Sequence, residues 1–289
     1  MTYLERVQFA TRYDLSSYAP VELEGAIVGY VHLELAEVLA DLSAVFQITE
    51  SGLSFQDSLA DYESRTLAFD SILPSLRDAG FVRAAVHEQF EVARTLGGRP
   101  LMAVDRSAVE SFGIISAGFH LNGVVGDRMW IARRAMDKPT FPGELDNMVA
   151  GGWPRGISLA DNVVKECAEE ANIPVELART ARPVGVMTYV MEVNGGLRRH
   201  AMYLMDLEVP HDFQPEAVDG EVDSFELMSI KEVARLVRET CEFKYNSAVA
   251  VIDHLIRTGR ITPEEPGYVD IVRGMHSPLN VMPSSMSIL

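Results

Sequence analysis

Residues 151–174, GGWPRGISLADNVVKECAEEANIP, constrain the fold more than any other part of the chain. The glycines that open this segment form a loop that lets backbone groups approach a ligand, and the loop leads directly into a helix. Ser158 is the predicted N-cap, with Asp161 three residues later. Apolar residues then recur at helical spacing and predict one buried face, formed by Ala160, Val163, Val164, Cys167, Ala168 and Ala171.

Three carboxylates, Glu166, Glu169 and Glu170, crowd onto one turn of the other face of that helix. Like charges three and four residues apart repel each other, at a cost of roughly 0.2–0.5 kcal/mol per pair. A solvated acidic face is the ordinary explanation of such a cluster. Clustered carboxylate oxygens are also the ligands that hard divalent cations take, usually together with substrate phosphate. Because a glycine-rich loop precedes the cluster, the sequence favours a magnesium site.

The same stretch resembles the box of the Nudix hydrolases, GX5EX7REUXEEXGU, in which U is a bulky apolar residue. Gly151 takes the first position, and Glu166, Glu169 and Glu170 take those of the metal-binding glutamates. Three positions differ from the family pattern: Ile157 replaces an early glutamate, Lys165 an arginine and Asn172 a late glycine. The early glutamate and the arginine tend to form a supporting ion pair in the family, so their joint loss leaves no charge unmatched.

The resemblance extends over about residues 118–270 and narrows to the Nudix subgroup related to, or fused with, thiamine pyrophosphokinase. The segments that carry it are RRAMDKPTFPGELDNMVAGG, KECAEEANIP, DGEVDSFELMSIKEV and FKYNSAVAVIDHLIRTGRI. It implies a Mg²⁺-dependent hydrolase, with Mn²⁺ as the alternative, that cleaves an organic diphosphate such as a damaged thiamine diphosphate and releases a phosphomonoester or phosphate. Two alternatives remain: a hydrolase of ADP-ribose- or NADH-type nucleoside diphosphates, and a non-catalytic Nudix domain that senses a ligand.

The resemblance and the position of each residue suggest roles for the site. The metal would be held by Glu166, Glu169, Glu170 and the carbonyl of Ala150. Either Glu166 or Glu221 would accept the proton of the attacking water. Candidate substrate-binding residues are Arg133, Arg134, Lys138, Gly151, Gly152 and Trp153. Trp153 could stack on a heterocycle, although packing within the loop is the simpler explanation for a large ring there.

The order of predicted elements indicates an α/β (α+β) protein with a Nudix-type α/β/α sandwich. Two strands around a Gly126–Asp127 turn precede the glutamate helix, and a second hairpin turns at 194–196. A strand and further helices follow. Residues 1–115 would form an N-terminal α+β accessory domain with helices near 20–48, 56–79 and 83–96, and residues 116–289 the Nudix domain.

Charge and hydropathy narrow the partners. A formal net charge of −17 argues against nucleic-acid binding, which draws on basic surface. The sequence contains no apolar run of the roughly 18–20 residues that a membrane helix needs. The N-terminus lacks a basic-then-apolar signal pattern, so a cytoplasmic location is expected. The expected partner is a small-molecule diphosphate, with a homodimer as a candidate assembly.

Overall fold

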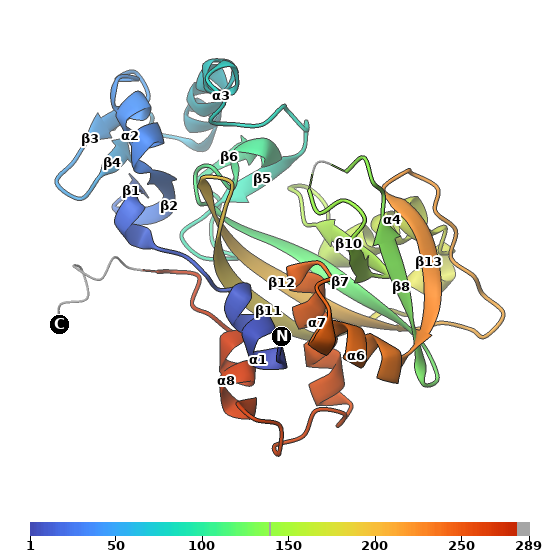
Figure 1. Ribbon diagram of the computed structural model, residues 1–289. Helices are drawn as coiled ribbons and strands as arrows, with labels where there is room; N and C mark the ends of the chain where they lie inside the picture. The colour runs from blue at the N-terminus through green and yellow to red at the C-terminus, as the bar shows by residue number, and fades with distance from the viewer. Residues whose placement is uncertain (139, 282–289) are drawn as a thin grey trace.

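The computed structural model describes residues 1–138 and 140–281 (Figure 1). A seven-stranded sheet dominates the second half; its strands follow the order β11–β12–β7–β8–β13, and β10 pairs with β7 while β9 pairs with β8. The strands are β7 (Ile115–Val125), β8 (Arg128–Arg134), β9 (Leu145–Asn147), β10 (Val149–Gly152), β11 (Arg182–Val193), β12 (Gly196–Glu208) and β13 (Val222–Ser229). Both predicted hairpins are confirmed, because β7 and β8 pair antiparallel across Gly126–Asp127 and β11 and β12 across Asn194–Gly195.

Helices cover both faces of this sheet, which confirms the predicted α/β/α sandwich (Figure 1). Phe119 and Leu121 of β7 pack into a core with the glutamate helix, whereas the alternate residues His120 and Asn122 face the other side of the sheet. The first face carries α4 (Leu159–Ala171) and α5 (Val175–Ala178). The second face carries α1 (Tyr3–Phe9), α6 (Ile230–Glu239), α7 (Tyr245–Arg257) and α8 (Tyr268–Gly274).

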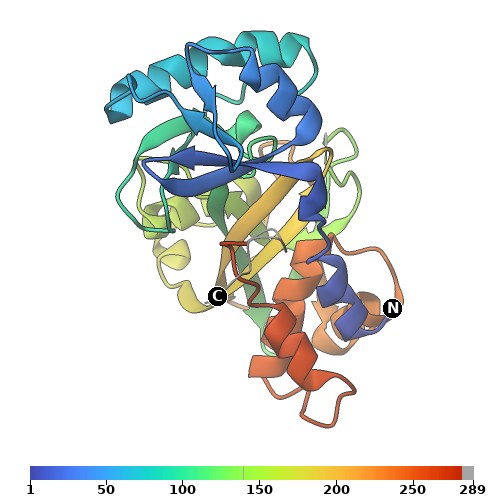
Figure 2. The same cartoon turned by 90° about the vertical axis from the view of Figure 1, so that its left-hand side faces the viewer.

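The first half is an α+β region with its own core (Figure 2). A four-stranded sheet has the order β2–β1–β4–β3, and β5 pairs with β6 in a separate ribbon. The elements are β1 (Tyr18–Leu23), β2 (Ala26–His32), α2 (Leu33–Ala40), β3 (Phe46–Ile48), β4 (Leu53–Phe55), α3 (Tyr62–Asp78), β5 (Gln89–Val92) and β6 (Met102–Asp105).

Two of the three helices predicted in this half are wrong. The segment 20–48 holds two strands before its short helix, because Glu24 and Gly25 adopt positive φ angles of 51° and 71° and turn the chain back on itself. The segment 83–96 contains β5, whose partner β6 lies further along the chain. The helix predicted over 56–79 is present as α3, which begins after the capping residue Asp61.

The domain boundary near residue 115 stays a prediction. Helix α1 belongs to the first half of the chain but packs against the second. Tyr3 and Val7 of this helix pack in the same core as Val233 of α6 and Ile271 of α8. Figure 2 shows α1 beside α8, apart from the rest of the first half. The first residues of the chain therefore help to cover the sheet of the second half.

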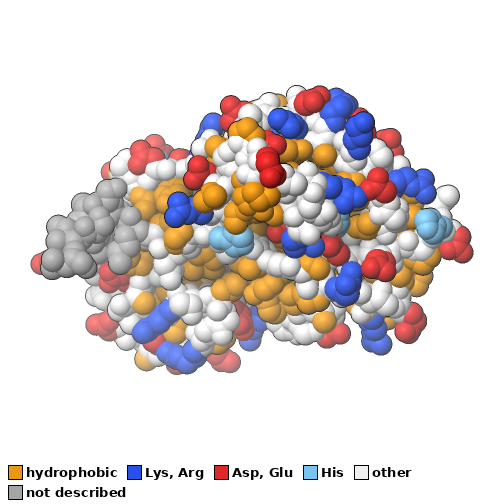
Figure 3. Space-filling model, turned by 90° about the horizontal axis from the view of Figure 1, so that it is seen from below, with side chains coloured by type: hydrophobic (Ala, Val, Ile, Leu, Met, Phe, Trp, Pro, Cys, Tyr) orange, Lys and Arg blue, Asp and Glu red, His pale blue; other side chains and the backbone are white. Residues whose placement is uncertain are grey.

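The surface carries charges of both signs. On the face seen in Figure 3, basic and acidic side chains lie among one another and among apolar groups. Although the net charge is −17, the acidic side chains on this face do not form one continuous patch. Across the described chain, helices are too short or too polar to cross a bilayer.

Candidate active site

The helix predicted from the glutamate segment is present as α4, with the expected caps. The Ser158 hydroxyl accepts a hydrogen bond from the Asp161 amide at 3.1 Å. Asn172 ends the helix with φ 51°, in the left-handed region that asparagine tolerates better than most residues. The departure from glycine at this position therefore keeps the same helix end.

The three glutamates of α4 lie at different depths. Glu170 is only 7% exposed, and its carboxylate accepts a hydrogen bond from the amide of Ala150 on β10 at 3.1 Å. The side chain of Glu169 is half exposed. Lys165 lies between Glu166 and Glu169, with its Nζ 3.1 Å and 2.9 Å from their carboxylates. The predicted all-acidic face is therefore divided into a buried carboxylate and two that share one ammonium.

Gly151 of β10 lies against the side chain of Glu166 on α4. A Cβ atom built at this glycine would lie 2.7 Å from Cγ and 2.9 Å from Cδ of Glu166. These distances are below normal van der Waals contact, so any side chain at position 151 would push Glu166 aside. The absence of a side chain at Gly151, the first glycine of the box, therefore leaves the space that the Glu166 carboxylate occupies.

Replacing Gly151 by alanine should cost activity while leaving the fold intact. The displaced Glu166 carboxylate should lower kcat/KM about 10- to 100-fold, the range seen when groups that orient a metal site are disturbed. Gly185→Ala is the matched control, because its new Cβ would meet its nearest atoms at 3.8 Å. Steady-state kinetics would contradict this account if the two variants behaved alike.

A polar hollow opens beside Glu170. Its lining residues are Ala132, Arg134, Asp146, Asn147, Ala150, Glu170, Glu221 and Val222. Burial raises the pKa of Glu170 well above its ordinary value, and the nearby carboxylates of Glu166, Asp146 and Glu221 raise it further, against the hydrogen bond from Ala150. Burial also raises the pKa of Glu166. A cation placed here would stabilise the ionised forms, so the residues present fit a divalent metal.

The carboxylates do not form a finished metal centre. Within residues 1–138 and 140–281, no three His, Cys, Asp or Glu side chains already converge as a set of metal ligands. The ammonium of Lys165 engages two of the three predicted ligands. Binding of a cation would therefore require Glu166 and Glu169 to exchange this partner for the metal.

The structure separates the two arginines at the end of β8. Arg134 lines the hollow, where its guanidinium donates to the carbonyls of Thr140 and Phe141 and pairs with Asp146 at 3.2 Å. Arg133 turns away, donates to the carbonyl of Gly143 and lies 4.0 Å from a carboxylate oxygen of Glu242. Only Arg134 is thus placed beside Glu170.

Lys138 and Glu221 form an ion pair. The Glu221 side chain is half exposed, so this candidate base is accessible to water. Trp153 donates from its indole nitrogen to the carbonyl of Ile157 at 2.8 Å and packs edge-on against Tyr203. These contacts give Trp153 a role in loop packing, and its contact with substrate stays a prediction.

Comparisons with known proteins agree with this geometry. A family model for the NUDIX domain matches residues 120–247, and one for a domain of unknown function (DUF4743) matches residues 2–116. Over 283 residues the chain is 36% identical to the Arabidopsis thaliana protein "Nudix hydrolase 24, chloroplastic", covering 95% of this chain and 78% of that protein. The chain belongs to the Nudix hydrolase family. It is also 35% identical to Nudix hydrolase 20, chloroplastic, of the same plant, covering 91% of this chain and 74% of that protein.

Membership in the Nudix hydrolase family makes this chain an enzyme of diphosphate chemistry. Nudix hydrolases act on small-molecule diphosphates and generally use divalent metals such as Mg²⁺ or Mn²⁺. A solved structure from Deinococcus radiodurans is 17% identical with a TM-score of 0.44, covering 56% of this chain and 97% of that one. The N-terminal match is to a domain of unknown function, so the predicted link to thiamine pyrophosphokinase stays a prediction.

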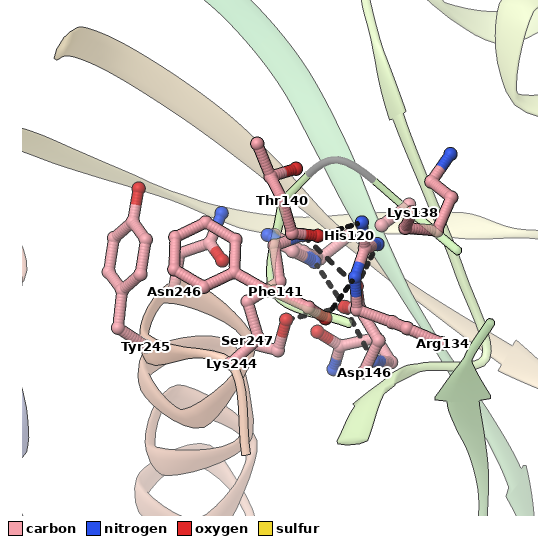
Figure 4. A network of polar contacts seen from close by, with 12 residues as sticks. His120, Arg134, Lys138, Thr140, Phe141, Asp146, Lys244, Tyr245, Asn246 and Ser247 are labelled. Carbon is pink, nitrogen blue, oxygen red and sulfur yellow. Dashed lines mark hydrogen bonds and ion pairs between the residues drawn. The ribbon is translucent and has the colours of Figure 1, made fainter. Parts of the chain in front are cut away.

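A buried polar network around Asp146 lies next to the hollow of this Nudix hydrolase (Figure 4). Asp146 is 4% exposed and contacts Arg134, Lys244 at 3.0 Å and the hydroxyl of Ser247. Burial lowers the pKa of the nearby His120 to about 3, with Lys244 adding to the effect, so this histidine is neutral at pH 7. Lys244 is not among the site residues predicted from the sequence, since its partner Asp146 lies 98 residues away along the chain.

Proposed function

We propose that this Nudix hydrolase cleaves the phosphoanhydride bond of an organic diphosphate with the help of Mg²⁺, for which Mn²⁺ could substitute. One observation carries the proposal: the carboxylate of Glu170 is buried beside a polar hollow with a single amide donor, next to further carboxylates. The protein itself places too little positive charge beside Glu170 to stabilise its ionised carboxylate. A cation bound together with substrate phosphate would supply it.

The proposed role of each site residue follows from its position around the hollow and the glycine loop. Glu166, Glu169, Glu170 and the Ala150 carbonyl would hold the metal, which when bound would neutralise phosphate oxygens and lower the pKa of a water. Gly151 and Gly152 keep β10 free of side chains beside the diphosphate. Arg134 lines the same hollow as Glu170 and would bind one phosphate. Arg133, Lys138 and Trp153 remain candidates for binding the rest of the substrate.

Glu221 is the proposed general base. It lines the hollow together with Glu170 and is accessible to water. Replacing Glu221 by glutamine should lower kcat about 100-fold or more with little change in KM, the size expected for loss of a general base. Glu226→Gln is the control, because this glutamate is exposed on β13, the strand that begins directly after Glu221. An unchanged kcat would transfer the role to Glu166.

The organic group attached to the diphosphate is proposed to be a nucleoside derivative, with thiamine as the alternative. Nudix relatives act on nucleoside diphosphate derivatives, which supports ADP-ribose or NADH as substrates, whereas thiamine diphosphate rests on the sequence resemblance alone. A panel of ADP-ribose, NADH, nucleoside diphosphates, thiamine diphosphate and its oxidised analogues with Mg²⁺ decides between them. Turnover of one class supports hydrolysis of that class. Binding without turnover would support a non-catalytic sensor instead.

Three further properties are proposed from the sequence: a domain boundary near residue 115, a cytoplasmic location and a homodimer. Limited proteolysis, cell fractionation and light scattering test them in turn. The Arabidopsis relatives are named as chloroplastic, and that location describes those proteins.

A further inference from the structure

The N-terminal half reaches the glycine loop of the Nudix box. The amide of Arg155, just beyond the loop, donates to the carbonyl of Gln89 on β5 at 2.8 Å. A Cβ atom built at Gly152 would lie 3.1 Å from the ring of Phe90 on the same strand. Residues upstream of position 115 therefore pack directly on the segment that precedes the glutamate helix.

Arg106 of the N-terminal half lies beside Gly152. Its Cζ atom lies 3.7 Å from the position that a Cβ of Gly152 would occupy, so the missing side chain lets the guanidinium come down on β10. Glu88 fixes it twice, because the Arg106 amide donates to the Glu88 carbonyl at 2.8 Å and the guanidinium pairs with the Glu88 carboxylate at 2.8 Å. The Arg106 side chain remains half exposed. A guanidinium has several N–H donors, and the one contact described here for its side chain uses only Nη1.

The two faces of β10 receive opposite charges. Successive residues of a strand point to opposite sides, so Gly151 faces the carboxylate of Glu166 and Gly152 faces Arg106. The neighbouring Arg155 is engaged elsewhere, over the ring of Tyr62 and beside Gln89. A diphosphate at the edge of β10 that faces away from β7, beside Ala150–Gly152, would thus have the metal-binding carboxylates on one side and Arg106 on the other.

We propose that Arg106 is a phosphate-binding residue that the N-terminal half supplies to the Nudix site, held over Gly152 by Glu88. This inference rests on the proposed diphosphate hydrolysis and assigns the N-terminal half a direct part in it. The planar guanidinium forms paired, charge-assisted hydrogen bonds to phosphate oxygens. Its ligand is the phosphate of the substrate that lies nearer the glycine loop.

Kinetics and binding of four variants test the proposal. Arg106→Gln should lower kcat/KM about 10- to 100-fold, the usual worth of a hydrogen bond to a charged group, and should weaken binding of inorganic pyrophosphate in Mg²⁺ by a similar factor in calorimetry. Arg106→Lys should recover part of both. Glu88→Gln should cause a smaller loss than Arg106→Gln in both assays, because the guanidinium remains while one of the two contacts that hold it is weakened. Arg99→Gln is the matched control, since Arg99 pairs with Glu24 and is 71% exposed.

The outcomes separate this proposal from the one on which it rests. If the parent protein turns over no diphosphate, the proposed hydrolysis fails, while weaker pyrophosphate binding by Arg106→Gln would still support the phosphate site. If the parent protein is active and Arg106→Gln matches Arg99→Gln in both assays, the inference is overturned. Equal losses in Arg106→Gln and Glu88→Gln would also overturn it, because the pair would then serve only to join the two halves.

Discussion

Replacing Glu170 by glutamine is expected to lower kcat/KM of the metal-activated reaction about 1,000-fold. A metal is worth several kcal/mol of charge stabilisation in the transition state, and each 1.4 kcal/mol is about tenfold in rate. Glutamine keeps the size of the side chain and an oxygen that accepts from the Ala150 amide. The loss should therefore come from the missing charge, and it should be accompanied by weaker Mg²⁺ binding in calorimetry.

Stability provides an independent check on the Glu170 variant. Burial raises the pKa of Glu170 and so opposes its charge, and neighbouring carboxylates repel it. With metal removed by EDTA, Glu170→Gln should be at least as stable as the parent protein. Glu176→Gln, on the exposed surface of α5, is the control and should change neither activity nor stability. A variant that lost activity only because it unfolded would contradict this account.

Replacing Asp146 by asparagine is expected to have the largest effect on stability. The carboxylate is buried between Arg134 and Lys244, so the neutral variant leaves two buried cations without their partner. Removing one member of a buried ion pair costs about 3–5 kcal/mol. For a chain of this size the melting temperature should fall by roughly 6–20 °C. Asp127→Asn is the control, because Asp127 pairs with Arg260 on the surface and is 76% exposed.

The pH dependence of stability gives the same prediction a second form. Burial opposes ionisation of Asp146, but the ammonium of Lys244 and the guanidinium of Arg134 outweigh it and hold the pKa of this carboxyl below its ordinary range. A lowered folded-state pKa stabilises the protein above the unfolded value of about 3.9, and this contribution is lost as the pH falls toward the folded-state pKa. Thermal melts of the parent protein should therefore fall more steeply below about pH 5 than those of Asp146→Asn. Parallel curves would contradict the assigned ion pair.

The parts of the structure that the sequence predicts are those that short segments determine. Ser158 is the N-cap of α4 as predicted, and the turns at Gly126 and Asn194 join the expected hairpins. Each of these features depends on residues within a few positions of one another. The helix predicted over 83–96 fails for the opposite reason, because β5 exists only through its pairing with β6.

The site shows the same limit. Glu166 and Glu170 are found from their spacing on one helix, but the burial of Glu170 depends on β10 packing against that helix. Lys244 and Asp146 are far apart in the sequence, and no local pattern joins them. Arg106 lies outside the Nudix match altogether. The glutamates of the box are therefore found from the sequence, whereas the residues packed around them emerge only from the fold.

The central claim is that a divalent cation held by the glutamates of α4 drives hydrolysis of an organic diphosphate. The most direct test follows the phosphorus NMR signals of ADP-ribose and thiamine diphosphate with the intact protein, in Mg²⁺ and in EDTA. The account predicts that the diphosphate resonances of one substrate give way to phosphomonoester or phosphate signals in Mg²⁺ and persist in EDTA. Equal hydrolysis in EDTA, or unchanged spectra for every diphosphate tested in Mg²⁺, would contradict it.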